Sequence, residues 1–217
     1  MDYVRTKAAT DMANKLEFNV LNGTGEQGQV PRGLLTRTDL AATTLAAAIP
    51  TNGRALSFSD LVSMEQTILN ENRLVEGGKF GYYMRSSLLQ GLRTQYAKLT
   101  DAGTVLDSLP ITPLQFMSVE NVEKYIGYKL GYSTLIPNTA QGSSNVASTV
   151  VFGDWRYLWV PFWGPMEMLM SNVATVGATS AFQNDMTFVR FVQMYDVGVM
   201  APNAFTKVSG FTPATVA

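Results

Sequence analysis

Apolar residues recur at every fourth position near the start of the chain. They share one face of a helix and are Ala8, Met12, Leu16 and Val20. Asn22-Gly23 then provides a stop signal, so the pattern predicts one helix over residues 2–21. At about 1.5 Å per residue, such a helix is roughly 30 Å long. Because this is long for a chain of 217 residues, we expect an elongated molecule.

A second helix is indicated by a capping box, in which a serine and a residue three positions later satisfy each other's backbone amides. Ser57 and Asp60 have this spacing, and Gly77-Gly78 is a stop signal, so we expect a helix from Ser57 to Gly78. Similar patterns predict a buried strand, a third helix, a helical turn and a bent strand over residues 80–84, 87–99, 119–125 and 125–137. Residues 100–114 and 138–148 are typical of loops.

The densest hydrophobic stretch runs from Thr149 to Met170. Six of twelve consecutive residues in it are aromatic, namely Phe152, Trp155, Tyr157, Trp159, Phe162 and Trp163. Glycine and proline residues divide the stretch into three short strands. Both faces of the middle strand are apolar, so both need cover. Two interpretations stay open: a buried sheet core, or an aromatic surface that partly contacts another subunit.

A second β-prone segment, Phe182 to Val199, contains no proline. At about 3.3 Å per residue, it would span more than roughly 40 Å if mostly extended. Arg190 and Asp196 interrupt its apolar run. They are either solvated or paired strand charges, or members of a salt bridge between subunits. Together with the N-terminal helix, so long a strand indicates a molecule that is flattened as well as elongated.

Charged residues are scarce, which changes the expected character of the surface. Only 15% of residues are charged and 46% are apolar, whereas about 25% charged residues is typical of proteins. With so few charges to cover the exterior, we expect part of the surface to contact a partner. The net charge of −1 and the lack of a basic segment argue against electrostatic nucleic-acid binding as the main function.

The chain contains neither cysteine nor histidine. This excludes disulfides, thiolate nucleophiles, sulfur metal sites and the commonest general base. Chemistry by lysine or by a carboxylate pair stays open, and two carboxylate pairs, Asp101 with Asp107 and Glu120 with Glu123, are the candidates for acid–base chemistry. The first pair lies in a predicted loop and the second on one helical face, where solvated charge is the ordinary explanation. We therefore expect no enzyme activity, no metal and no cofactor.

Residues 23–28 match the G-x-G-x-x-G dinucleotide pattern only formally. That motif requires a strand before it and a helix after it. Here a helix precedes it and Pro31 follows it, so we interpret the segment as a mobile turn.

Membrane insertion is not expected. The longest uncharged run, Leu130 to Gly153, is interrupted by proline and polar residues, and the first residues lack the apolar region of a signal peptide. These patterns predict a soluble protein that is made inside the cell.

Five blocks of sequence occur in a recognisable order over nearly the whole chain. They are Leu21–Gly25 with Pro31–Leu35, Tyr83–Leu89, Ile126–Tyr128 with Ile136-Pro137, Val151–Trp155, and Val197–Phe205. The first block is similar to a spine helix with its glycine-rich turn, and the last to a closing V-x-x-P-x-A-F strand. Taken together, the blocks resemble the major capsid proteins of tailed bacteriophages, whose Hong Kong 97-type fold is shared with encapsulins.

The resemblance implies an α+β fold of the Hong Kong 97 type, with a long spine helix, long antiparallel strands and a mixed-sheet axial subdomain. Residues 1–39 would hold the spine helix and turn of a peripheral-type subdomain, and residues 40–164 the axial-type subdomain. Residues 165–195 would add the long peripheral strands, and residues 196–217 would return to the axial-type subdomain.

The start of the chain differs from the family pattern. Family members carry an N-terminal arm and an extended loop before the spine helix, whereas this sequence begins almost directly on the helix. Those parts could be cleaved, truncated or encoded elsewhere. Because some relatives carry a cross-linking lysine on that loop, we expect no self-catalysed isopeptide bond here.

The resemblance implies a structural function, as a major capsid protein that self-associates into pentamers, hexamers and an icosahedral shell around a DNA genome. Contact with packaged DNA would be non-specific and on the inner face, and the protein would be made in the host bacterial cytoplasm and end in the virion. An encapsulin-like compartment shell is the alternative, and a carboxylate-dependent enzyme is a third. The candidate subunit-interface residues are Arg5, Lys15, Arg32, Arg37, Trp155, Trp163, Arg190 and Asp196.

Overall fold

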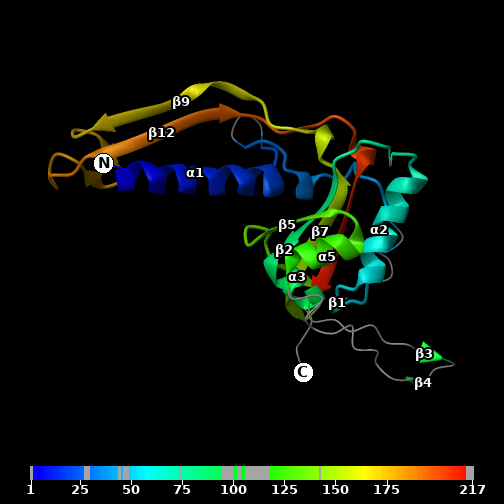
Figure 1. Ribbon diagram of the computed structural model, residues 1–217. Coiled ribbons are helices and arrows are strands. Elements are labelled where there is room, and N and C mark those ends of the chain that lie inside the picture. Colours follow the sequence, from blue (N-terminus) through cyan, green and yellow to red (C-terminus); the bar gives the residue numbers. More distant parts are fainter. Residues whose placement is uncertain are drawn as a thin grey trace.

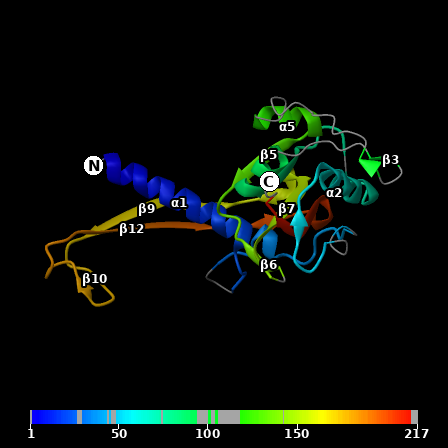
Figure 2. The same cartoon turned by 90° about the horizontal axis from the view of Figure 1, so that it is seen from below.

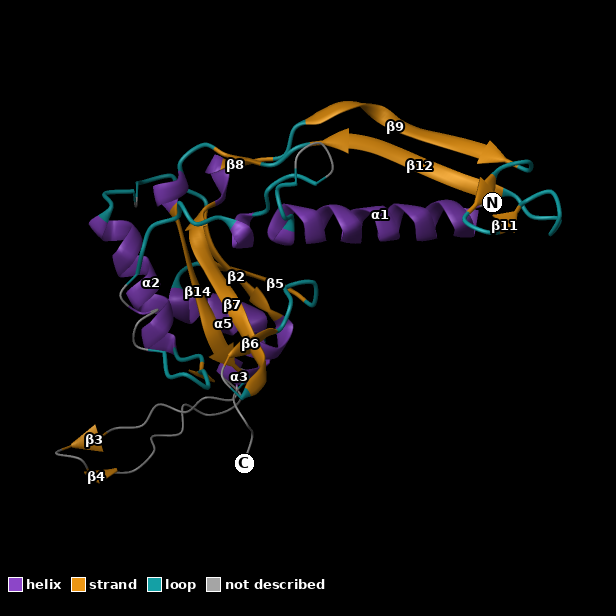
Figure 3. Cartoon of the chain, turned by 180° about the vertical axis from the view of Figure 1, so that it is seen from behind, coloured by secondary structure: helices purple, strands orange, loops and turns teal. Residues whose placement is uncertain are grey.

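The computed structural model describes residues 2–26, 30–43, 45, 49–73, 75–93, 100–101, 104–105, 118–141 and 143–213. These residues form two parts, a rounded body and a long arm that projects from it (Figures 1 and 3). The body contains the main β-sheet. The arm contains the first helix and a two-stranded ribbon. The elongated shape expected from the sequence is confirmed.

The body is built on a six-stranded mixed sheet in the order β1-β14-β7-β2-β5, with β6 paired to β7. The strands are β1 (Arg54–Ala55), β2 (Phe80–Arg85), β5 (Lys129–Ser133), β6 (Thr139–Gln141), β7 (Ser144–Asp154) and β14 (Phe205–Thr212). β1 is parallel to β14 and β2 to β5, while β7 is antiparallel to its three partners. The sheet therefore joins segments that lie far apart in the sequence.

Among the described residues, three helices pack on the body, α2 (Phe58–Asn70), α3 (Ser86–Arg93) and α5 (Val119–Ile126). The main core contains fully buried side chains from the helices and the sheet, including Met64, Ile68, Tyr82, Met84, Leu88, Leu92, Phe152 and Phe211. The rings of Tyr82 and Phe152 stack with centroids 4.3 Å apart. Val151 belongs to a second cluster, with Leu34 and Phe205. Because neighbouring strand residues point to opposite faces, β7 is buried on both sides.

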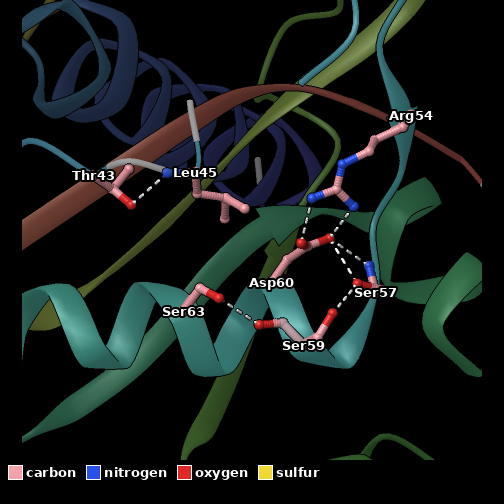
Figure 4. Close-up of polar contacts among 7 residues, drawn as sticks. All are labelled: Thr43, Leu45, Arg54, Ser57, Ser59, Asp60 and Ser63. Atoms are coloured by element: carbon pink, nitrogen blue, oxygen red, sulfur yellow. Dashed lines mark hydrogen bonds and ion pairs between the residues drawn. The ribbon is translucent and has the colours of Figure 1, made fainter. Parts of the chain in front are cut away.

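α2 begins as the sequence predicts. The backbone N–H of Ser57 donates a hydrogen bond of 2.9 Å to the Asp60 carboxylate, and the capping box is complete (Figure 4). Arg54 adds two hydrogen bonds of 2.7 and 2.5 Å to the same carboxylate, which is 2% exposed as a residue. The predicted end at Gly78 is wrong, since the helix ends at Asn70 and Asn72 adopts a left-handed conformation with φ of 53°.

The arm consists of α1 (Asp2–Asn22) and the ribbon of β9 (Phe162–Ser171) and β12 (Phe188–Tyr195). The ribbon runs beside α1, and its tip lies at the same end of the arm as the N terminus (Figures 1 and 2). At the tip, β10 (Thr175–Val176) pairs with β11 (Thr179–Ser180). The predicted helix is confirmed, whereas the strand expected from Phe182 is shorter, because residues 182–185 form turns that end at Asp185, with φ of 50°.

The aromatic stretch divides into a buried part and an exposed part. β7 ends at Asp154 inside the core, and a short helical turn, η3 (Trp155–Tyr157), follows it. β8 (Leu158–Trp159) then pairs with β13 (Gly198–Val199). Beyond it, the first nine residues of β9 are exposed. Of the two interpretations left open by the sequence, the buried sheet core describes the first half of the stretch, whereas the second half is an exposed aromatic surface.

Other segments also differ from expectation. Residues 138–148 are not a loop but include the hairpin of β6 and β7, in which Thr139 pairs with Ala147. Two short strands, β3 (Thr100–Asp101) and β4 (Thr104–Val105), pair within another predicted loop. α3 begins at Ser86 and is described only to Arg93, so the predicted helix beyond it lies outside the described residues. The described residues also include two short helical turns, η1 (Leu34–Thr36) and η4 (Pro202–Ala204).

Candidate assembly surface

The two faces of the ribbon follow from its register. Directly paired residues of antiparallel strands point to the same face. Phe191 pairs with Met168 and Tyr195 with Phe162, while on the opposite face Arg190 pairs with Leu169, Val192 with Glu167 and Met194 with Trp163. We call the first the inner face, because several of its residues line a groove against α1, and the second the outer face.

The inner face and α1 enclose a groove of about 450 Å³. Its apolar lining comes from both elements and consists of Met12, Ala13, Leu16, Phe162, Met166 and Phe191. The amide of Asn19 donates a hydrogen bond of 2.6 Å to the Tyr195 hydroxyl across the groove. The apolar stripe of α1 that the sequence predicts is partly covered. Its members, Ala8, Met12, Leu16 and Val20, are all half-buried.

The outer face is apolar and open. Trp163, Leu169 and Met194 are 55%, 54% and 65% exposed. Glu167 and Arg190 are exposed charged residues on this face. An isolated two-stranded ribbon is marginally stable in water and needs cover on at least one face. α1 covers the inner face only in part and the outer face not at all, so the ribbon is a candidate surface for association.

Exposed methionines are frequent in and around the ribbon, a feature that sequence reasoning missed. Six methionines between residues 162 and 200 are exposed, and they are Met166, Met168, Met170, Met186, Met194 and Met200. Methionine side chains are flexible and polarizable, and they are frequent on surfaces that adapt to partners. The signal in the sequence was the M-E-M-L-M run of residues 166–170, which lacks the alternation of apolar and polar residues that marks a half-buried strand.

A second cavity, of about 620 Å³, lies where the ribbon joins the body. Three predicted interface residues line it together, and they are Arg32, Trp163 and Asp196. Arg32 comes from the turn after α1, whereas the other two come from the base of the ribbon. The Asp196 carboxylate accepts a hydrogen bond of 2.7 Å from the N–H of Val197, which keeps it near the neck of the arm.

The glycine-rich turn after α1 is a tight backbone crossing. The N–H of Gly33 donates a hydrogen bond of 2.9 Å to the carbonyl of Gly23. A Cβ on Gly33 would lie 2.4 Å from the Gly23 nitrogen, so no side chain fits there. The dinucleotide pattern thus falls on a turn after a helix, a context that does not fit a cofactor. Part of the expected mobile turn, residues 27–29, lies outside the described residues.

The other predicted interface residues are dispersed. Lys15 lines the inner groove, with its amino group 5.6 Å from the Phe18 ring centroid. Arg37 forms an ion pair of 3.0 Å with Asp39. Arg5 lies in α1, and its side chain is outside the described part of the chain.

Trp155 is used within the chain. Its indole N–H donates a hydrogen bond of 3.0 Å to the Gly81 carbonyl. Its ring lies edge-on to Tyr83 and Phe205, with centroid distances of 5.7 and 5.6 Å. These contacts join β2 and β14 beneath the neck of the arm, so its predicted contribution to an interface remains a prediction.

Two of the four carboxylates considered for catalysis have ordinary structural partners, whereas Asp107 and the side chain of Asp101 lie outside the described part of the chain. Glu120 pairs with Lys124 at 3.1 Å and Glu123 with Lys129 at 3.0 Å. The N–H of Leu130 donates to Glu123 and lowers the pKa of that carboxyl, with Lys129 adding to the effect. Within the described residues, no three acidic side chains gather where a metal ion could bind. None of the helices in this part is long and apolar enough to cross a membrane.

Known proteins show the same architecture. The holo-SrpI encapsulin complex from Synechococcus elongatus PCC 7942 is 12% identical, with a TM-score of 0.51 over 98% of this chain and 66% of that one. The capsid of an empty GTA particle is 18% identical, with a TM-score of 0.50 over 97% and 66%. Gordonia phage Cozz is 15% identical, with a TM-score of 0.49 over 99% of this chain and 64% of that one. The first two likenesses confirm the expected α+β Hong Kong 97-type fold.

This chain spans 64–66% of the length of those three structures. No curated protein matches its sequence. Residues 1–210 match the sequence profile described as the phage capsid family. Because that match covers nearly all of the 217 residues, the chain belongs to the phage capsid family.

Proposed function

We propose that this chain is a structural subunit of an icosahedral phage capsid, which works by associating with copies of itself. The observation that carries the proposal is the arm. A two-stranded ribbon that exposes Trp163, Leu169 and Met194 needs cover from outside the chain. Membership of the phage capsid family makes copies of the same chain the natural source of that cover.

The subunits form pentameric and hexameric rings that close into a shell. A closed shell requires repeated lateral contacts, and a low charge density suits surfaces that become buried between subunits. The shell holds DNA through non-specific contacts on its inner face, and these contacts are weak, because the net charge is −1 and the sequence has no basic segment to bind phosphates. The protein is made in the host bacterial cytoplasm and reaches its final place in the virion. It has no catalytic role.

The body and the arm correspond to the two subdomains inferred from the family resemblance. Residues 40–164 and 196–217 form the axial-type subdomain, which contains the main sheet. Residues 1–39 and 165–195 form the peripheral-type subdomain, which contains α1 and most of the ribbon. The division is supported by the strand pairing, because β14 returns to the body sheet after the ribbon is complete.

An encapsulin-like compartment would use the same fold for a different content. The likeness to the SrpI encapsulin, at 12% identity, is a likeness of fold. The content of purified particles separates the two functions. Nuclease-protected DNA supports the phage capsid, whereas an enclosed protein cargo without DNA contradicts it.

The proposal is tested by sedimentation velocity and negative-stain microscopy of the purified chain over a range of concentrations. We expect rings or shells whose fraction rises with concentration. A Leu169→Asp and Met194→Asp double variant should associate much less, because it places two charges on the exposed ribbon. Val62→Asp is the matched control, since Val62 is 62% exposed on the body. A protein that stays monomeric at every concentration, without particles, would contradict the proposal.

A further inference from the structure

The outer face of the ribbon carries one acidic and one basic residue at its centre. Leu169 of β9 lies opposite Arg190 of β12, and Glu167 lies opposite Val192. These four residues form a rectangle in which the charged pair occupies one diagonal and the apolar pair occupies the other. Diagonal neighbours in a sheet lie about 7–8 Å apart.

Both charges are left without a partner inside the described chain. Glu167 and Arg190 are exposed, and neither forms an ion pair with a described residue. By contrast, Asp60 and Asp154, which lie in the body, each pair with an arginine. The central charges of the outer face are therefore available to a partner.

This charge pattern is complementary to itself. Consider a two-fold axis that lies parallel to the face, midway between two stacked copies, and runs along the Leu169–Val192 diagonal. Rotation about this axis places Glu167 of one copy at the position of Arg190 of the other. Two copies related by this axis would bring each acid over the other copy's base. Leu169 and Val192 would each face their own counterparts and exclude water from the two ion pairs. The strands would cross at a steep angle, close to the orthogonal class of sheet packing.

We propose that the outer face of the ribbon packs against the same face of a second copy of this chain, with Glu167 of each copy paired to Arg190 of the other. The proposal rests on the proposed function, because it names one surface through which the subunits associate. It also places Trp163 and Met194 at the margin of the contact, where large apolar side chains surround the central pairs.

Charge reversal gives the decisive experiment. Glu167→Arg alone and Arg190→Glu alone each create two like-charge contacts per pair of copies. Each should weaken association, measured by sedimentation velocity at low salt, by roughly tenfold or more. An equimolar mixture of the two variants should associate as the original protein does, because every central contact is again between opposite charges. The double variant E167R/R190E should also associate normally.

A single introduced cysteine tests the two-fold geometry, since the chain contains no cysteine. Stacked sheets lie about 10 Å apart, so a short bis-maleimide should cross-link Leu169→Cys to its counterpart in a second copy. Met168→Cys is the matched control, because it lies on the inner face of the same strand. It should cross-link much more slowly at the same protein concentration.

The outcomes separate this inference from the proposed function. If particles form and the single charge reversals change nothing, or if the mixture fails to restore association, the two-fold contact is wrong and the capsid function stands. Equal cross-linking of the two cysteine variants overturns the contact as well. If the original protein forms no assembly at all, both the two-fold contact and the proposed capsid function are wrong.

Discussion

The side-chain amide of Asn19 donates a hydrogen bond of 2.6 Å to the hydroxyl of Tyr195, although the two residues are 176 positions apart in the sequence. Asn19 lies near the end of α1, and Tyr195 is the last residue of β12. The bond joins the helix and the ribbon at the end of the arm nearest the body (Figure 1). It therefore limits how far the two elements can separate.

Tyr195→Phe should loosen the ribbon and leave the body intact. Loss of this half-buried hydrogen bond should lower the free energy of unfolding by about 1 kcal/mol. Hydrogen exchange of β9 and β12 amides should accelerate, whereas amides of β2 and β7 keep their rates. Tyr3→Phe is the control, because Tyr3 is 80% exposed on α1. A uniform acceleration over the whole chain would show that the bond has no local role.

Asp154 should make stability depend on acid pH. Burial raises the pKa of this carboxyl, but hydrogen bonds from Arg156 and from the N–H of Lys79 outweigh burial and hold the pKa below its usual range. A lowered folded-state pKa stabilises the protein fully above the unfolded value of about 3.9, and this stabilisation is lost as the pH falls through the folded value.

Asp154→Asn tests this contribution by thermal unfolding between neutral and strongly acid pH. At neutral pH the variant should be less stable by about 2 kcal/mol, because a charged acceptor is lost from a buried site. The difference between the variant and the original protein should shrink below about pH 4. A difference that stays constant down to acid pH would assign the effect to packing alone.

Gly33→Ala should disrupt the turn that follows α1. Its Cβ would lie 2.4 Å from the Gly23 nitrogen and 2.6 Å from the Leu21 carbonyl oxygen, so the backbone must move. We expect a loss of about 1–3 kcal/mol in the free energy of unfolding. In the control, Gly198→Ala, the new Cβ meets nothing within 4 Å. Equal effects of the two substitutions, measured by denaturant unfolding, would refute the close crossing.

Asp60→Ala should destabilise the body more than removal of the Ser57 hydroxyl, the other member of the capping box. The carboxylate holds both Arg54 and the N-terminal turn of α2, so its loss leaves a half-buried guanidinium unpaired and should cost about 3 kcal/mol. Ser57→Ala should cost about 1 kcal/mol. Ser63→Ala should be close to neutral, because its hydroxyl donates only to the Ser59 carbonyl, one turn earlier on the exposed side of α2 (Figure 4). The reverse ranking in denaturant unfolding would contradict this assignment.

Local signals in the sequence predicted the parts of the fold that local contacts determine. The capping box at Ser57 and the four-residue stripe of α1 depend on residues within a few positions of one another, and both predictions are confirmed. The end of α2 was predicted too late, because Asn72 takes the left-handed conformation that glycine normally provides.

Non-local pairing determined the parts that the sequence could not predict. Phe152 and Trp163 are both aromatic residues in a β-prone stretch, but only β7 lies between two other strands of the body sheet. The same residue types therefore form a buried core at Phe152 and an exposed surface at Trp163. The strand predicted from Phe182 also proved too long, because turns occupy its first residues.

The candidate interface residues were partly grouped by the fold. Arg32, Trp163 and Asp196 line one cavity, although no pattern in the sequence places them together. Glu167 and Leu169 were missed because the exposed half of the ribbon has the composition of a core strand.

The central claim is that the arm becomes covered when copies of the chain assemble. Methionine oxidation by dilute peroxide, read by mass spectrometry on monomers and on assembled particles, tests it most directly, since exposed thioethers are converted to sulfoxides. Met64 and Met84, both 0% exposed, provide internal controls. We predict that Met166, Met168, Met170 and Met194 oxidise several-fold more slowly in particles than in monomers, while the controls stay unchanged. Equal oxidation of the four arm methionines in both forms would contradict the account.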